Sequence, residues 1–556
     1  MGRANWPGWV GIAVAGLLIA PLVSVIGNAV SPDNGAWAHI ASTILPGLVI
    51  DSLLLALLVA VGVAILGTVC AWLTANHEFP GRAAFEWMLI LPLAMPAYVA
   101  AYAYTDLLQY AGPVQSGMRE AFGWQFKSDY WFPEIRSLGG AATMLAFVLY
   151  PYVYVLARVA FLEQAASMAE AGRTFGYGRL GIFWRVSLPL ARPAIAAGMA
   201  LTLMETLADY GTVSYFGVST FTTGIFNAWF SQGDRASAGK LAVILMLFVA
   251  AVVLLEHAAR NRSRFFQGGH RHERAPLTGL HKWLASAFCA LPLLVGFAVP
   301  TLLLLRLAVA DGDPAFGARF LQLAANSFGV AAVTAFLAVG LGLLLAYSAR
   351  LSASRLNRGV NRLAGLGYAI PGTVIAVGVL IPVAQLDHAL IALLEKITGN
   401  QLPLLLTGSV IALVYAYLIR FLGVALQSVD AGLTKITPSM DDAARSLGAG
   451  VGSVALRVHV PLLKGSLVTA SLLVFVDVMK ELPATLVMRP FNFDTLAVQA
   501  YTLAMDERLT EASTASLAIV AVGLIPVILA SRAITRPQRP APAGRQQIKR
   551  SRLPGA

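Results

Sequence analysis

The chain has 556 residues, of which 58% are hydrophobic and 12% are charged, and its formal net charge is +12. Soluble domains usually carry about 25% charged residues, so this composition excludes a disordered protein, a collagen and an ordinary cytosolic enzyme. The net charge alone would suggest a nucleic-acid partner, but the high hydrophobicity argues against one. Cys70 and Cys289 both lie in apolar runs, which predicts small buried hydrophobes rather than a disulfide or a Cys-based metal site.

Twelve apolar segments are long enough to cross a membrane, which requires about 20 residues for about 30 Å of hydrocarbon. In the first half they lie at about 8–30, 50–74, 86–110, 139–163, 193–216 and 239–259. In the second half they lie at about 283–308, 326–349, 363–386, 403–428, 463–488 and 513–532. The first could be a signal peptide, but its apolar stretch is long and no clear cleavage site follows, so we interpret it as an uncleaved anchor. The sequence therefore predicts an all-α multi-pass membrane protein.

The basic residues indicate which ends of these helices face the cytoplasm. The connection 260–282 carries six Lys or Arg and one acid, 350–362 carries four Arg, and the tail from Arg532 carries seven basic residues and no acid. The loops 31–39 and 310–316, which fall on the other side, are acidic or neutral. We therefore predict that both termini are cytoplasmic. The connection and the tail account for the whole net charge, so the charge is a topology signal and not a nucleic-acid footprint.

The two six-helix halves repeat one another along the sequence. Asp51-Ser52 corresponds to Asn326-Ser327 at an offset of 275, and from about 170 to 229 the offset is 272 without a gap. Because each repeat has an even number of helices, both halves keep the same orientation. This predicts a parallel pseudo-twofold axis along the membrane normal rather than an inverted repeat.

The best-matched segment of the repeat is a loop on the predicted cytoplasmic side. Its two copies are EAGRTFGYGRLGIFWRVSLPL at 170–190 and DAARSLGAGVGSVALRVHVPL at 442–462. We expect a short helix that ends at Gly176 or Gly448, because glycine readily takes the positive φ of a helix C-cap. A second short helix should follow and be stopped by Pro189 or Pro461. The alternative is that both copies are only solvated amphipathic loops left by an old duplication.

This pattern resembles the EAA-x3-G-x9-I-x-L-P loop of the permease subunits of bacterial ABC importers, with Asp442 in place of Glu. In that family the loop forms a coupling helix that docks on the ATPase subunit. The resemblance implies that two ATPase copies bind two sets of residues. These are Glu170, Ala171, Gly176 and Pro189 in the first loop and Asp442, Ala443, Gly448 and Pro461 in the second.

Acidic residues occur within two predicted membrane helices, where a charge costs about 2.5–3.5 kcal/mol on insertion scales. Glu205 and Asp209 lie in the fifth helix, and Asp477 and Glu481 lie at the corresponding positions of the eleventh. Each pair is spaced i, i+4 and so shares one helix face, which should be turned to the interior.

Two hypotheses remain open for these four acids. In the first, they line a cation-attracting path between the halves. In the second, they are structural groups that pair with Lys480, Arg158, Arg420 or helix ends.

Residues 46–533 resemble more specifically the fused, two-domain permeases of ferric-iron importers. The segments KELPATL (480–486) and DTLA (494–497) carry most of this likeness. The resemblance implies the type I ABC importer permease fold, Fe3+ as substrate, a periplasmic binding protein that delivers it, and two copies of a separate ATPase. Carboxylates suit a hard cation, but no His or Cys cluster demonstrates a metal site, and we assign no metal ligand. Thiamine, a polyamine or another small substrate remains an alternative.

No GxxxxGK[ST] run for binding nucleotide occurs. We therefore expect a transport component of the inner membrane, without catalytic residues or a cofactor, whose partner binds ATP. The predicted parts are permease domains at 1–259 (core 46–259) and 283–533, a basic linker at 260–282 and a disordered basic tail at 534–556. An ion-coupled secondary transporter is less favoured because that class typically carries inverted repeats. A receptor or scaffold would leave both the buried acids and the duplicated loop unexplained.

Overall fold

The computed structural model describes residues 6–32, 35–164, 174, 176–260, 274–310, 317–351, 359, 361, 363–434 and 436–535. Within these ranges the chain is mostly helical. Eleven described helices are long and apolar enough to cross a membrane, or twelve if Arg82–Ala94 and Ala97–Phe122, bent by 92°, are counted as one span. The predicted all-α membrane fold with about twelve spans is confirmed.

The described helices of the first half are α1 (Trp6–Val30), α2 (Ala36–His39), η1 (Ile40–Ile44), α3 (Leu45–Asn76), α4 (Arg82–Met88), η2 (Leu91–Ala94), α5 (Ala97–Leu108), α6 (Pro113–Phe122), η3 (Lys127–Asp129), α7 (Leu138–Glu163), α9 (Arg179–Ile182), η4 (Phe183–Ser187), α10 (Leu188–Ala208), α11 (Gly211–Tyr215), α12 (Phe221–Phe226), η5 (Asn227–Ser231) and α13 (Arg235–Arg260). Those of the second half are α14 (Leu280–Leu293), η6 (Leu294–Ala298), α15 (Val299–Ala310), α16 (Ala318–Leu351), η7 (Leu366–Ala369), α18 (Gly372–Thr398), α19 (Val410–Leu433), α20 (Pro438–Ser446), α21 (Val451–Val454), η8 (Ala455–His459), α22 (Val460–Met479), α23 (Pro483–Met488), α24 (Leu496–Met505) and α25 (Leu509–Thr535). The short strands β1 (His77–Glu78) and β2 (Ala275–Pro276) pair in parallel.

The two halves share their architecture and at least one specific contact. The turns η2 and η7 keep the sequence offset of 275, and η4 and η8 keep the offset of 272. The Ser52 hydroxyl accepts a hydrogen bond from the backbone N–H of Phe221, the first residue of α12, at 3.2 Å. The Ser327 hydroxyl accepts the equivalent bond from Leu496, the first residue of α24, at 2.8 Å. The predicted parallel six-helix repeats are therefore confirmed.

Small residues let the helices of the core approach one another closely. A Cβ atom at Gly67 of α3 would lie 2.6 Å from the Cβ of Val153 in α7. A Cβ atom at Gly198 of α10 would lie 2.6 Å from the Cα of the same Val153. Helix association in lipid depends on such close packing, because lipid tails are as apolar as leucine. Large side chains on outward faces stay exposed, as Phe336 of α16 does at 78%.

The first helix of each half packs against the other half. Helix α1 contacts α16 and α18, while α15 contacts α5 and η6 contacts α7. The Tyr415 hydroxyl donates to the carbonyl of Leu17 in α1 at 2.5 Å. The Tyr104 hydroxyl donates to the carbonyl of Val295 in η6 at 2.8 Å. Helix α1 also packs on α13 and α15 on α25 of their own halves, so each first helix joins the two halves. The predicted domain limits stay a prediction.

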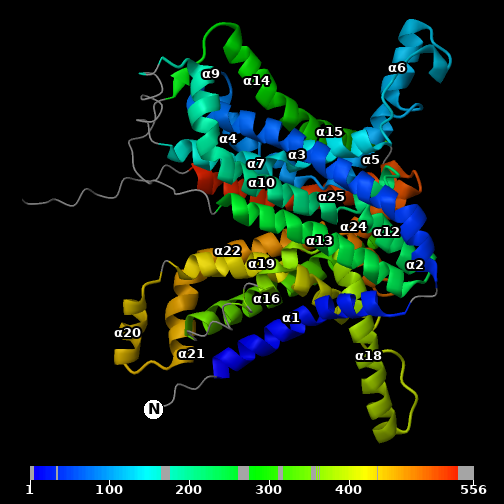
Figure 1. Ribbon diagram of the computed structural model, residues 1–556, viewed down its shortest axis with the longest axis vertical. Helices are drawn as coiled ribbons and strands as arrows, with labels where there is room; N and C mark the ends of the chain where they lie inside the picture. Colours follow the sequence, from blue (N-terminus) through cyan, green and yellow to red (C-terminus); the bar gives the residue numbers. More distant parts are fainter. Residues whose placement is uncertain are drawn as a thin grey trace, which may run out of the picture.

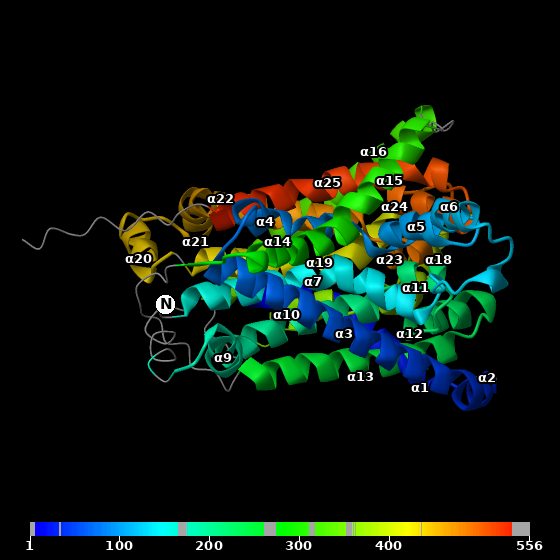
Figure 2. The ribbon, with the colours of Figure 1, turned by 90° about the horizontal axis from the view of Figure 1, so that it is seen from above.

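The bundle has two distinct ends (Figures 1 and 2). At one end α1 begins, α25 ends, and the short helices α9, α20 and α21 lie; we call this the loop-motif end. Helix α6 and part of α18 project at the opposite end (Figure 1). Both ends of the described chain lie at the loop-motif end of the bundle, as a topology with an even number of spans requires. That this side is the cytoplasm stays a prediction.

Pro189 and Pro461 do not stop a helix, contrary to the sequence prediction. Leu180–Ala208 and Gly452–Met479 are each one continuous span, and the π-helical turns η4 and η8 end two residues before the prolines. A proline ring lacks the N–H and collides with the carbonyl of the preceding turn in a regular α-helix. The wider π turn displaces that carbonyl, so the helix continues.

The packing of α1 on α18 predicts a strong effect of Gly378→Ala. A Cβ atom there would lie 2.5 Å from the Pro21 carbonyl oxygen and 2.9 Å from a methyl group of Val25. Overpacking of this kind typically costs about 1–3 kcal/mol, so we expect a lower Tm of the detergent-solubilised protein. Gly340→Ala in α16 is the matched control, because nothing lies within 4 Å of that position. Equal Tm values for the two variants would contradict the packing described here.

Candidate functional site

A cavity of about 110 Å³ lies between the two halves, and all four predicted path acids line it. It is bounded by residues of both repeats. Its polar lining consists of Tyr98, Tyr152, Glu205, Asp209, Tyr210, Tyr368, Arg420, Asp477, Lys480 and Glu481. The structure therefore brings together the acids that the sequence paired at an offset of 272.

Helices that are interrupted in the described chain surround this cavity, where the sequence predicted continuous spans. Helix α5 begins after Pro96 and α18 begins after Pro371, at equivalent positions of the two halves. Helix α10 ends at Ala208 before α11, and α22 ends at Met479 before α23. Each new helix start exposes backbone N–H groups without intrahelical partners, so the cavity wall needs hydrogen-bond acceptors.

The second acid of each pair supplies these acceptors. Asp209 Oδ1 accepts the backbone N–H groups of Thr212 and Val213 at 3.0 and 3.1 Å. Glu481 accepts the backbone N–H groups of Ala484 and Thr485 at 2.9 and 3.0 Å. These two acids therefore hold the starts of α11 and α23, as the structural hypothesis expected for helix ends.

Glu481 also forms a buried ion pair with Arg420 of α19. The distance from Arg420 Nη1 to Glu481 Oε1 is 3.2 Å, and the side chains are 10% and 1% exposed. Gly372, the first residue of α18, lies against this pair: a Cβ atom there would collide with the Arg420 guanidinium and lie 2.7 Å from Glu481 Oε1. The pair thus joins α19, α23 and the start of α18 at one point.

The first acids of the two pairs, Glu205 and Asp477, also line the cavity, but their partners differ from those of Asp209 and Glu481. Asp477 forms an ion pair with Lys480, with 2.9 Å between Oδ1 and Nζ. Glu205 shares the cavity lining with Tyr152 and Tyr368. Glu205 and Asp477 are therefore the acids of the described cavity whose carboxylates are not used to cap a helix.

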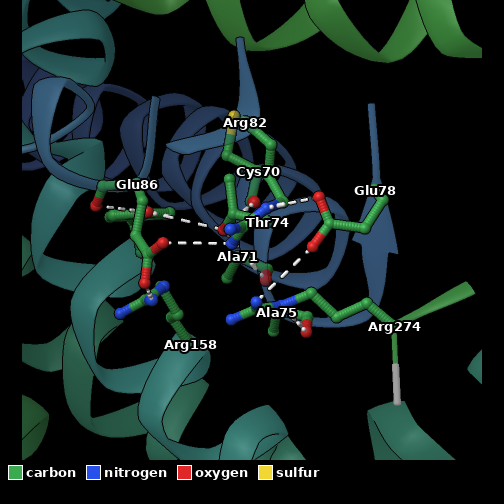
Figure 3. A network of polar contacts seen from close by, with 10 residues as sticks. Cys70, Ala71, Thr74, Ala75, Glu78, Arg82, Glu86, Arg158 and Arg274 are labelled. Atoms are coloured by element: carbon green, nitrogen blue, oxygen red, sulfur yellow. Dashed lines mark hydrogen bonds and ion pairs between the residues drawn. The ribbon is translucent and has the colours of Figure 1, made fainter. Parts of the chain in front are cut away.

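Arg158 does not reach the cavity, contrary to one of the predicted pairings. It forms an ion pair with Glu86, and Arg82 joins Glu86 to Glu78 through two contacts of 3.0 Å (Figure 3). Arg274 reaches Glu78 at 3.5 Å. This network lies beside the β1–β2 pairing and fixes the chain after residue 273 to the end of α3.

The second loop motif forms a helix that stands apart from the bundle. Helix α20 contains Asp442 and Ala443, whose side chains are both exposed. Gly448 has a φ of +84°, and the N–H of Ala449 donates to the Ala444 carbonyl at 3.1 Å. This is the hydrogen bond of a glycine-ended helix, so the predicted C-cap at Gly448 is confirmed.

Three side chains hold α20 in place. Asp441 accepts from Arg350 of α16 at 3.0 and 3.1 Å and pairs with the buried His459 of η8 at 2.6 Å. Partial burial raises the pKa of Asp441, but the hydrogen bonds from His459 and Arg350 outweigh it and hold the pKa below its ordinary value of 3.8. A lowered carboxyl pKa stabilises the folded state fully at pH values above 3.8, and this stabilisation is lost as the pH falls through the lower folded-state pKa. Asp441 thus stays charged at physiological pH.

The first loop motif is described only in part. Gly176 has a φ of +76°, which matches the predicted helix end, and Pro189 lies in the first turn of α10. Glu170 and Ala171 lie outside the described residues. In the second motif Pro461 lies in the first turn of α22.

Comparison with known proteins shows which proteins this chain is similar to. Residues 63–260 match the family described as "Binding-protein-dependent transport system inner membrane component". With the eleven or more apolar spans of the described chain, this confirms a multi-pass inner-membrane protein with the permease fold of ABC importers.

Individual relatives extend the likeness over most of the chain. The chain is 26% identical over 486 residues to the Fe(3+)-transport system permease protein FbpB 2 of Haemophilus influenzae, covering 86% of this chain and 88% of that protein. It is 26% identical over 417 residues to the putative ferric transport system permease protein FbpB 1 of the same organism, covering 71% of this chain and 62% of that longer protein. It is 26% identical over 219 residues to the sulfate transport system permease protein CysT of Salmonella typhimurium, covering 38% and 75%. The predicted resemblance to permeases of ABC importers, ferric permeases among them, is confirmed.

The buried ion pair predicts that Arg420→Met strongly destabilises the protein. Removing one partner of a buried pair leaves an uncompensated charge and costs about 3–5 kcal/mol. We expect a large drop in the Tm of the solubilised protein. Arg319→Met is the matched control because Arg319 is exposed. A variant of Arg420 as stable as this control would show that the pair does not hold the three helices together.

Proposed function

We propose that this chain is the permease of an ATP-driven importer that carries ferric iron through the cavity between its halves. A periplasmic binding protein delivers the substrate, and two copies of a separate ATPase dock on the two loop motifs and bind the ATP. The observation that supports this best is the cavity lined by equivalent acids of both repeats. The likeness to ferric permeases over most of the chain supports iron as the substrate.

The geometry suggests how movement of the loops reaches the cavity. Leu180–Ala208 ends one residue before Asp209, and Gly452–Met479 ends two residues before Glu481. A helix of 28 residues is about 40 Å long, so each loop motif is joined to a cavity acid by one rigid rod. When the ATPases close, the two loops approach each other and the rods turn about the central axis. This opens the cavity outward, and ATP hydrolysis restores the inward-facing state.

Glu205, Asp209, Asp477 and Glu481 take two roles in this proposal. Asp209 and Glu481 keep the interrupted helices together during the movement. Glu205 and Asp477 attract the cation, and oxygen ligands suit Fe3+ as a hard ion. Among the described residues, no three His, Cys, Asp or Glu side chains gather to hold a metal ion.

Uptake of radiolabelled Fe3+ tests the substrate. Cells without this protein should accumulate at least tenfold less label than cells in which it is restored, because the chain forms the whole path. Glu205→Gln combined with Asp477→Asn should lose most of the uptake, whereas Glu120→Gln, an exposed residue of α6, should not. Equal uptake with and without the protein, in a strain that has no second importer, would exclude iron and leave thiamine or a polyamine to be tested.

Copurification tests the docking of the ATPase. Gly176→Asp combined with Gly448→Asp should release the ATPase, because both glycines have a positive φ that an Asp adopts at a cost and both lie in the docking loops. Gly123→Asp is the matched control: Gly123 also has a positive φ, of +72°, and ends α6 away from the loop motifs. Retention of the ATPase by the double variant would refute the docking proposal.

A further inference from the structure

The cationic residues among the described cavity lining are held in different ways. Arg420 is 10% exposed and is fixed by Glu481. The Lys480 side chain is 32% exposed and pairs with Asp477, three residues earlier in the chain. Glu205 lines the same cavity and adds negative charge to the surroundings of the Lys480 ammonium. It therefore lies among the groups that would receive a cation.

Two of the four cavity acids, Glu205 and Asp477, cap no helix and so have carboxylates that could attract a mobile cation. The carboxylates of Asp209 and Glu481 accept hydrogen bonds from backbone N–H groups, and Glu481 also forms an ion pair with Arg420. Glu205 and Asp477 remain, and Lys480 neutralises one of these two. Lys480 consequently offsets one of the two carboxylate charges that are not engaged at a helix start.

The ammonium enters the cavity from one half of the molecule. The residue of the first repeat that corresponds to Lys480 at the offset of 272 is Ala208. The backbone carbonyl of Lys480 accepts a 3.5 Å hydrogen bond from the Tyr98 hydroxyl of the first half. The backbone at position 480 is thus held at the contact between the halves, while the side chain has a flexible four-carbon stem.

We propose that the Lys480 ammonium is a tethered counter-ion that occupies the cation position of the cavity between transport cycles and thereby rejects cations of low charge. An entering ion must displace the ammonium from Asp477. The Coulomb energy gained with the carboxylates is proportional to the charge of the ion, so a trivalent ion displaces the ammonium more readily than a divalent one. This inference rests on the proposed transport of a trivalent cation and assigns its charge selectivity to one residue.

The first test measures Mn2+ binding to the purified full chain by electron paramagnetic resonance. Lys480→Met leaves Glu205 and Asp477 without a counter-ion, and we expect it to bind Mn2+ at least tenfold more tightly than the unmodified chain. Lys480→Arg keeps the charge and should bind as weakly as the unmodified chain. Lys464→Met is the matched control, because Lys464 is an exposed lysine of α22, the helix that ends one residue before Lys480. If Lys480→Met does not accumulate in the membrane, Lys480→Gln is measured in its place.

The second test measures radiolabelled Fe3+ uptake by cells in the presence of excess Mn2+. We expect uptake by the Lys480→Met strain to be inhibited at least tenfold more strongly than uptake by the unmodified strain, with Lys480→Arg unchanged. Equal Mn2+ binding by Lys480→Met and the unmodified chain, or equal effects of the Met and Arg substitutions, would overturn the inference. If Lys480→Met binds Mn2+ more tightly but the unmodified chain takes up no Fe3+, the counter-ion role is supported and iron is refuted as the substrate.

Discussion

A helix that is interrupted inside a membrane must find hydrogen-bond partners for its free N–H groups, because lipid offers none. The cavity of this protein depends on that constraint. Asp209 and Glu481 satisfy the starts of α11 and α23, and Arg420 compensates the charge of Glu481 in a site that water hardly reaches. Without these acceptors the two breaks would not be stable in lipid, and the helices would not diverge to enclose a polar space.

The same acids end the two rods that begin at the loop motifs. Pro189 and Pro461 would break these rods in a regular α-helix, and the π turns before them preserve the continuity. A movement at the loop-motif end is therefore transmitted along a single hydrogen-bonded element to the residue that caps the break. This arrangement places the stiff part of the molecule between the loops and the cavity and the interrupted part at the cavity itself.

Much of this structure could be predicted from the sequence, because hydropathy and an internal repeat depend only on the residue types along the chain. The spans, the parallel repeat and the glycine at the end of α20 are of this kind. The interruptions at Asp209 and Glu481 could not be predicted, since an apolar run looks the same whether its helix is broken or continuous. Spacing i, i+4 likewise placed both acids of a pair on one face. It did not show that one caps a helix while the other faces the cavity, because that difference arises from partners in other elements.

The symmetric backbone carries an asymmetric set of charges. Arg350, Asp441 and His459 brace the second loop, whereas the corresponding residues of the first half are Ala75, Ala169 and Ser187. The first half instead has the Glu78–Arg82–Glu86–Arg158 network at the end of α3 (Figure 3). Arg420 and Lys480 correspond to Val148 and Ala208. Fusion of the two halves into one chain permits this divergence, because each half has a fixed partner. A permease built from two identical chains would place every one of these charges twice, including a second lysine in the cavity.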